Sequence, residues 1–217
     1  MKLSRLGFFL VPFLLSSLFS TFAAERTNPN LDEPETRAAD SDASSEKSWV
    51  MAVSGGIGHT NYSGPLKARV DGYRATANAD DTATMNFDYY VAWALSNRKT
   101  VVGPSISLGM NMYNSDYLAD LTVSDIFLGA TFVHYFEELK HGPFARADVG
   151  FVATQTSTDY TDNYEHSYEG AGFRLGLGYS IRAGSRFGVP IMLQWQYASL
   201  DESASANTFL LSGGFTF

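Results

Sequence analysis

Residues 170–182 read GAGFRLGLGYSIR, and their side chains alternate strictly between two kinds. The odd-numbered positions are apolar, whereas the even-numbered positions are small or polar. Successive side chains of a β-strand point to opposite faces of the sheet. The segment therefore predicts a strand with one apolar face and one small, polar face. The members of the two faces are Ala171, Phe173, Leu175, Leu177, Tyr179 and Ile181, and Gly170, Gly172, Arg174, Gly176, Gly178, Ser180 and Arg182.

The same period of two recurs in eight runs from Trp49 to the last residue. They are residues 49–61, 83–96, 100–113, 122–136, 143–156, 165–182, 187–199 and 206–217. Short connections (97–99, 137–142 and 183–186) alternate with longer polar ones (59–83, 114–121, 157–164 and 200–205). This alternation is typical of membrane barrels, in which strands of about 9–11 residues cross the bilayer. The sequence thus predicts an all-β fold, an eight-stranded antiparallel up-and-down transmembrane β-barrel.

The charged residues of the polar face decide which face of the sheet lines the barrel interior and which face meets lipid. A charge that faces lipid at the bilayer midplane costs roughly 2–4 kcal/mol, so these residues belong inside. We expect a barrel-interior polar network in which three acids pair with two arginines, made of Asp88, Asp125, Arg146, Asp148, Arg174 and Gln194. The apolar face then meets lipid. Membrane barrels carry a girdle of aromatic residues at each membrane–water interface, and aromatic residues near strand ends suit these positions. The residues that we expect there are Trp49, Trp93, Tyr179, Trp195 and Tyr197.

A soluble barrel is the alternative, with its apolar face lining a cavity and its polar face in water. The alternation is the same in both cases. The polar face, however, lacks the Lys and Glu cover that a solvated surface needs. With 18% charged and 14% aromatic residues, the composition also suits an apolar outer surface.

The first 48 residues differ in composition from the rest. Residues 1–24 combine Lys2 and Arg5, an apolar core and small residues up to Ala24, which is the pattern of a secretory signal peptide. We expect export with cleavage near residue 23 or 24; a membrane anchor is disfavoured because the core is short. Residues 25–48 hold seven acids, three bases and a single large aliphatic residue, which predicts an acidic disordered linker before a barrel at 49–217.

Composition also excludes several classes of function. The 217 residues contain no cysteine, which rules out a disulfide framework, a thiolate metal site and a catalytic cysteine. The net charge of −8 argues against nucleic acid as a partner. No phosphate-binding glycine loop is present, so no cofactor is expected.

The last strand, residues 207–217 (NTFLLSGGFTF), ends in Phe with mostly apolar residues at every second position before it. It resembles the terminal recognition strand of bacterial outer-membrane barrels. Residues 170–180 and 141–150 (HGPFARADVG) resemble the sixth and fifth strands of the small OmpA-like outer-membrane barrel family. The resemblance implies an eight-stranded barrel in the outer membrane of a Gram-negative bacterium, and we expect a monomer. It also implies that Phe215 and Phe217 form a C-terminal assembly signal for the barrel assembly machinery.

The resemblance does not select one activity, because such barrels serve several. We expect an integral outer-membrane protein that is not an enzyme and acts through its surface loops or as a structural component. A narrow channel for small molecules is the alternative. In the first long loop, Lys67, Arg69 and Arg74 are candidates for contact with lipopolysaccharide phosphates.

Enzyme chemistry is less well supported. Deacylation of lipid A by a related barrel would need a His and a Ser on one face, whereas the adjacent His166 and Ser167 fall on opposite faces. Lipid A palmitoylation would need an amphipathic N-terminal helix, and an outer-membrane protease would need ten strands. Residues 159–165 (DYTDNYE) offer oxygen ligands for a divalent cation, but they match no calcium-loop motif, and a solvated loop is the simpler interpretation.

Overall fold

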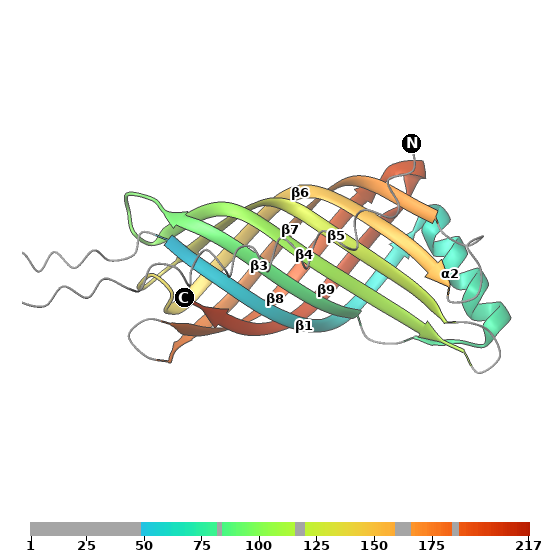
Figure 1. Ribbon diagram of the computed structural model, residues 1–217, viewed down its shortest axis with the longest axis horizontal. Helices are drawn as coiled ribbons and strands as arrows, with labels where there is room; N and C mark the ends of the chain where they lie inside the picture. The colour runs from blue at the N-terminus through green and yellow to red at the C-terminus, as the bar shows by residue number, and fades with distance from the viewer. Residues whose placement is uncertain (1–48, 82–83, 116–119, 159–165, 184–186) are drawn as a thin grey trace, which may run out of the picture. The chain divides into compact units, whose positions relative to one another are not determined.

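The computed structural model describes residues 49–81, 84–115, 120–158, 166–183 and 187–217 (Figure 1). The predicted signal peptide, the predicted linker and the loop at 159–165 lie outside the described residues. Eight long strands form the fold: β1 (Trp49–Ser63), β3 (Thr84–Ala94), β4 (Thr100–Asn114), β5 (Leu121–Tyr135), β6 (Gly142–Thr158), β7 (His166–Arg182), β8 (Gly188–Leu200) and β9 (Ser205–Thr216). The shorter elements are α2 (Gly64–Ala77), β2 (Asp80–Asp81) and η2 (Asp201–Ser203).

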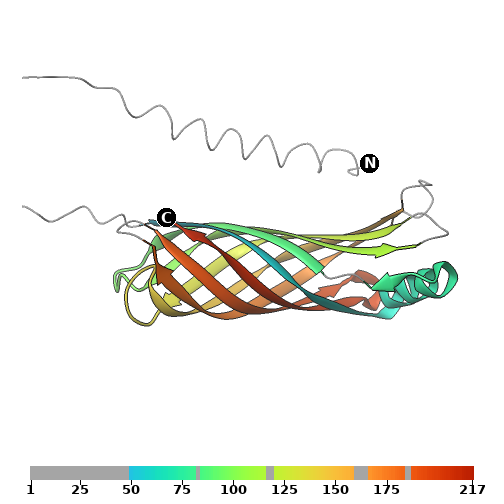
Figure 2. The same ribbon diagram turned by 90° about the horizontal axis from the view of Figure 1, so that it is seen from below.

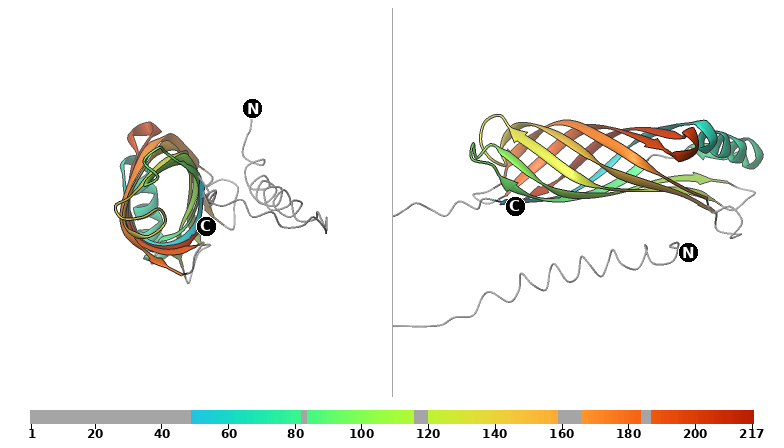
Figure 3. Two further views of the ribbon diagram at one scale, coloured as in Figure 1. Left: turned by 90° about the vertical axis from the view of Figure 1, so that its left-hand side faces the viewer. Right: turned by 90° about the horizontal axis from the view of Figure 1, so that it is seen from above.

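The sheet closes on itself. Every long strand pairs antiparallel with the next long strand in the chain, and the first, β1, pairs with the last, β9. The backbones of Met51 and Phe217 complete this seam with two hydrogen bonds of 3.2 and 2.8 Å. Closure leaves no long strand edge unpaired, which hydrocarbon requires. The predicted eight-stranded antiparallel barrel is confirmed, and Figure 3 shows it from one end.

The two ends of the barrel differ. At the end that we call the turn end, short connections join β3 to β4, β5 to β6 and β7 to β8, and the chain enters at Trp49 and finishes at Phe217. At the opposite loop end lie α2, β2 and η2 (Figure 2). In outer-membrane barrels, short turns face the periplasm and longer connections face outward. The loop end is therefore the outer end.

The prediction that residues 59–83 form a polar loop is wrong. β1 continues to Ser63, and the helix α2 follows. Pro65 stands in its first turn, and Asn78, in a left-handed conformation (φ 47°), ends it. Its apolar side chains are spaced for one face of a helix, and that face packs against the inside of the loop end. The face consists of Leu66, Val70, Tyr73 and Ala77.

The outward face of the barrel is an apolar belt. On β8 the outward positions are apolar from Val189 to Tyr197, and the next one is Ser199; on β6 they are apolar from Pro143 to Ala153, and the next is Gln155. These spans match the 9–11 residues with which a tilted strand crosses a bilayer. Large side chains in the belt are strongly exposed, as in Phe151 at 78%. The barrel therefore carries a lipid-facing surface, as the alternation predicted.

The inside is less polar than the sequence suggested. Large apolar side chains fill both ends of the lumen and leave the polar residues between them. The turn-end cluster comprises Val50, Ala52, Tyr90, Ala92, Val101, Val133, Tyr135, Phe144 and Met192. The loop-end cluster comprises Leu66, Val70, Ala77, Ala79, Tyr113, Leu121, Val123, Phe127, Val152, Tyr168, Ala198, Leu200, Ala204 and Ala206. Within the part of the chain that the structure describes, no helix is long and apolar enough to cross a membrane.

Candidate functional site: the polar lumen

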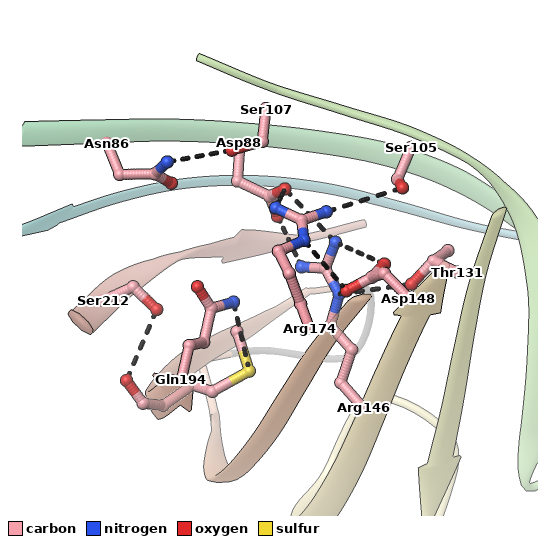
Figure 4. Close-up of polar contacts among 11 residues, drawn as sticks. Asn86, Asp88, Ser105, Ser107, Thr131, Arg146, Asp148, Arg174, Gln194 and Ser212 are labelled. Carbon is pink, nitrogen blue, oxygen red and sulfur yellow. Dashed lines mark hydrogen bonds and ion pairs between the residues drawn. The ribbon is translucent and has the colours of Figure 1, made fainter. Parts of the chain in front are cut away.

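Four charged side chains meet in the middle of the lumen (Figure 4). Arg146 of β6 and Arg174 of β7 both donate to Asp88 of β3. Arg146 binds both carboxylate oxygens of Asp88, with its second bond, from Nη2 to Oδ1, at 3.2 Å; Arg174 Nη1 lies 2.8 Å from Oδ1. Asp148 Oδ1 accepts from Arg146 Nε at 3.2 Å and from Nη2 at 3.0 Å. We call these four residues the quartet.

The second oxygen of Asp148 completes the ring of charges. Asp148 Oδ2 lies 3.3 Å from Arg174 Nε, an ion-pair distance without hydrogen-bond geometry. Each of the four side chains is at most 3% exposed. Because an isolated buried charge costs several kcal/mol, the quartet is stable only as a set.

Neutral groups hold the two arginines in place. Thr131 Oγ1 accepts from Arg146 Nε at 3.1 Å, and Ser105 lies 3.5 Å from Arg174 Nη2. Each guanidinium also lies over an aromatic ring: Arg146 is 4.7 Å from the centroid of Tyr90, and Arg174 is 4.3 Å from that of Phe127. Such cation–π contacts are strongest where water is excluded. The arginines therefore span the lumen in a fixed orientation.

The predicted interior network comes together only in part. Asp125 and Gln194 are buried, as their strand positions require, but neither reaches the quartet. Asp125 accepts one hydrogen bond from Thr154 Oγ1 at 3.2 Å. Gln194 Nε2 lies 3.6 Å from Met192 Sδ, and its carbonyl oxygen is buried without a partner.

The predicted girdle residues face outward near the two margins of the belt. Trp49 and Trp93 are paired across β1 and β3 near the turn end, and Tyr179 lies at that level on β7. Trp195 and Tyr197 lie toward the loop-end margin on β8. Both pack on Phe173, with ring centroids 5.3 and 5.7 Å apart.

The two residues of the predicted assembly signal also face outward. Phe215 is 52% exposed and Phe217 is 39% exposed, and their ring centroids are 6.5 Å apart. Phe215 lies on β9, opposite Val53 of β1, and Phe217 follows the end of β9 and is hydrogen-bonded through its backbone to Met51.

His166 and Ser167 lie on opposite faces of β7, as the sequence predicted. His166 points inward beside Tyr168, with its ring 3.4 Å from the carboxylate of Glu202, whereas Ser167 points outward. In the turn before β6, burial and the nearby Arg182 lower the pKa of His141, which keeps its ring neutral at pH 7. Among the described residues, no group of three or more His, Asp or Glu side chains is placed to hold a metal ion.

A closed antiparallel barrel with an apolar belt, aromatic margins and a filled polar lumen defines the class of this protein: an outer-membrane β-barrel. No protein-family model matches the chain, and no curated protein matches its sequence.

Several solved structures are similar to this chain over most of its length. Ail, the attachment invasion locus protein of Yersinia pestis, in complex with the heparin analogue sucrose octasulfate, is 16% identical, with 78% of this chain and 99% of that chain covered and a TM-score of 0.47. Neisserial surface protein A is 10% identical, with 76% and 95% covered and a TM-score of 0.47. The N-terminal β-barrel domain of Pseudomonas aeruginosa OprF is 14% identical, with 79% and 98% covered and a TM-score of 0.36.

The quartet generates a stability prediction. Asp88→Asn keeps the shape of the side chain but leaves two buried guanidinium groups with one carboxylate. We expect the free energy of unfolding, measured by urea titration in detergent micelles, to fall by about 3–5 kcal/mol. The matched control is Asp71→Asn in α2, which removes an exposed pair with Lys67 (3.0 Å) and is expected to cost about 0–1 kcal/mol. Equal effects of the two variants would contradict the account of the quartet.

Proposed function

We propose that this protein is a non-conducting outer-membrane barrel, without enzymatic activity, that acts through the surface formed at its loop end. The observation that carries the proposal is the filling of the lumen along its length. The turn-end cluster, the quartet and the loop-end cluster follow one another inside the barrel. An eight-stranded barrel is only wide enough to be filled by side chains.

The helix α2 supports a role for the loop end. Leu66 and Val70 are buried in the loop-end cluster, at 0% and 3% exposure, so one face of the helix is anchored to the barrel. The opposite face, with Lys67 and Asp71, remains exposed. A docked helix presents a fixed surface at low entropic cost, unlike a flexible loop.

Conductance distinguishes this proposal from the narrow channel. In planar bilayers we expect no stepwise current from the purified protein. We also expect none from Arg146→Gln or Arg174→Gln, because both apolar clusters stay in place when a charge is removed. Steps in the wild type, or steps that appear on neutralising either arginine, would favour the channel and make the quartet its gate.

Lipopolysaccharide is the partner that we propose for the loop end. α2 lies beyond the apolar belt on the outer side, where the phosphates of this lipid are found, and it carries Lys67, Arg69 and Arg74. Cationic side chains at a membrane surface contribute about 1 kcal/mol each toward anionic lipid.

A triple variant tests this partner. Replacing Lys67, Arg69 and Arg74 by Ala should weaken binding of lipopolysaccharide to the detergent-solubilised barrel by at least about tenfold, as measured by calorimetry. Lys99→Ala, in a turn at the periplasmic end, is the control and should bind as the wild type does. Unchanged affinity in the triple variant would remove α2 from the lipid contact.

A further inference from the structure

The buried charges of the lumen do not balance. Three carboxylates, of Asp88, Asp125 and Asp148, face two guanidinium groups, of Arg146 and Arg174. The quartet uses both arginines and two of the acids. One negative charge is left over, and it belongs to Asp125.

Asp125 is isolated from every cation in the described ranges. No Lys, Arg or His nitrogen there forms an ion pair with it, and its hydrogen bond from Thr154 Oγ1, at 3.2 Å, is a neutral one. The side chain is buried, at 7% exposure. A buried carboxyl group needs a counter-charge, a metal ion or a proton, because a bare buried charge is strongly unfavourable.

A small cavity adjoins this carboxylate. Its volume is about 10 Å³, which suits a single water-sized occupant. The lining consists of Thr84, Asn86, Ser107, Gly109, Asp125, Phe127, Gln196 and Thr208. At Gly109 a Cβ atom would stand 2.7 Å from Asp125 Oδ2, so glycine leaves the carboxylate its place beside the cavity.

The cavity also holds an unpartnered amide. Gln196 is 5% exposed and lines the cavity, yet its side chain has no hydrogen bond to any residue that the structure describes. A buried polar group without a partner is costly. A proton on Asp125 would remove the charge but leave Gln196 as it is, whereas an oxygen-binding occupant of the cavity contacts both the carboxylate and the amide oxygen of Gln196.

The side chains that line the cavity offer several oxygen atoms as possible ligands. Asn86 donates its amide nitrogen to Ser107 Oγ at 2.8 Å, which leaves its carbonyl oxygen available. Thr84 and Thr208 supply hydroxyl oxygens, linked through Thr60 at 2.9 and 3.0 Å. Carboxylate, amide and hydroxyl oxygens are the ligands of hard cations.

We propose that the cavity beside Asp125 binds a single monovalent cation, sodium. One positive charge balances the lumen, whereas a divalent ion would overcompensate it. Arg174 does not oppose the ion strongly: it stacks on Phe127, which lines the cavity, but Asp88 and Asp148 already balance its charge. The barrel thus carries a structural ion just outward of the quartet.

Thermal unfolding of the full-length protein tests this proposal. The protein is refolded into maltoside micelles at pH 8 in sodium chloride from 0.1 to 100 mM, with choline chloride keeping the ionic strength constant. A constant concentration of urea lowers the midpoint of thermal unfolding into the measurable temperature range. Above the dissociation constant, the midpoint should rise by about 3 °C for each tenfold increase in sodium. A midpoint that does not change with sodium would overturn the proposal.

Three variants assign the effect to the cavity. Asp125→Asn should lose the sodium dependence and unfold at a higher temperature than the wild type in choline alone, because its cavity carries no unbalanced charge. Gln196→Leu should lose most of the dependence. Gln194→Leu is the matched control, since it removes a buried glutamine of the same strand outside the cavity, and it should keep the dependence in full. Sodium dependence that persists in Asp125→Asn would overturn the proposal.

A direct measurement covers the case in which Asp125→Asn does not fold. The ²³Na resonance should broaden in the presence of the wild-type barrel and of Gln194→Leu, and stay narrow with Gln196→Leu. Equal broadening with all three proteins would contradict the site. Stabilisation of the wild type by micromolar calcium would contradict the monovalent assignment.

Discussion

Hydrocarbon offers no hydrogen-bond partner to a peptide group, and this constraint governs the whole structure. A sheet that crosses a bilayer must close, so β1 has to meet β9 and every long strand has two neighbours. Closure at eight strands then fixes a lumen that side chains fill. The strict alternation of the strands follows as well, because each residue must suit either lipid or that narrow interior.

The interior of the barrel is filled by three successive layers of side chains. Apolar clusters occupy both ends, and the quartet lies between them, where ion pairs and hydrogen bonds replace water. Because the apolar clusters exclude solvent from both sides, the charges interact in a low dielectric, which makes a complete quartet strong and an unpaired member costly. The helix α2 belongs to this arrangement, since Leu66 and Val70 form part of the outer cluster.

The sequence predicted the features that follow from the two-residue periodicity of the strands. It did not predict which inward-facing side chains meet across the barrel. Strand number, order and the direction of each side chain follow from local alternation, and they agree with the structure. α2 carried a local signal, the spacing of Leu66, Val70, Tyr73 and Ala77, which the polar composition of residues 59–83 obscured. The isolation of Asp125 carried no local signal. Asp88 and Asp125 both point inward, and only the positions of β6 and β7 decide which of them meets Arg146 and Arg174.

The assignment of faces is the central claim, and the absence of cysteine makes it directly measurable. Single cysteines placed along β7 from 171 to 181, labelled with a fluorophore in reconstituted vesicles, report contact with lipid through quenching by a spin-labelled acyl chain. The account predicts strong quenching at odd positions such as 175 and 177, and weak quenching or poor labelling at even positions such as 174 and 176. Strong quenching at the even positions, or a protein that stays in solution with its odd positions protected, would contradict it.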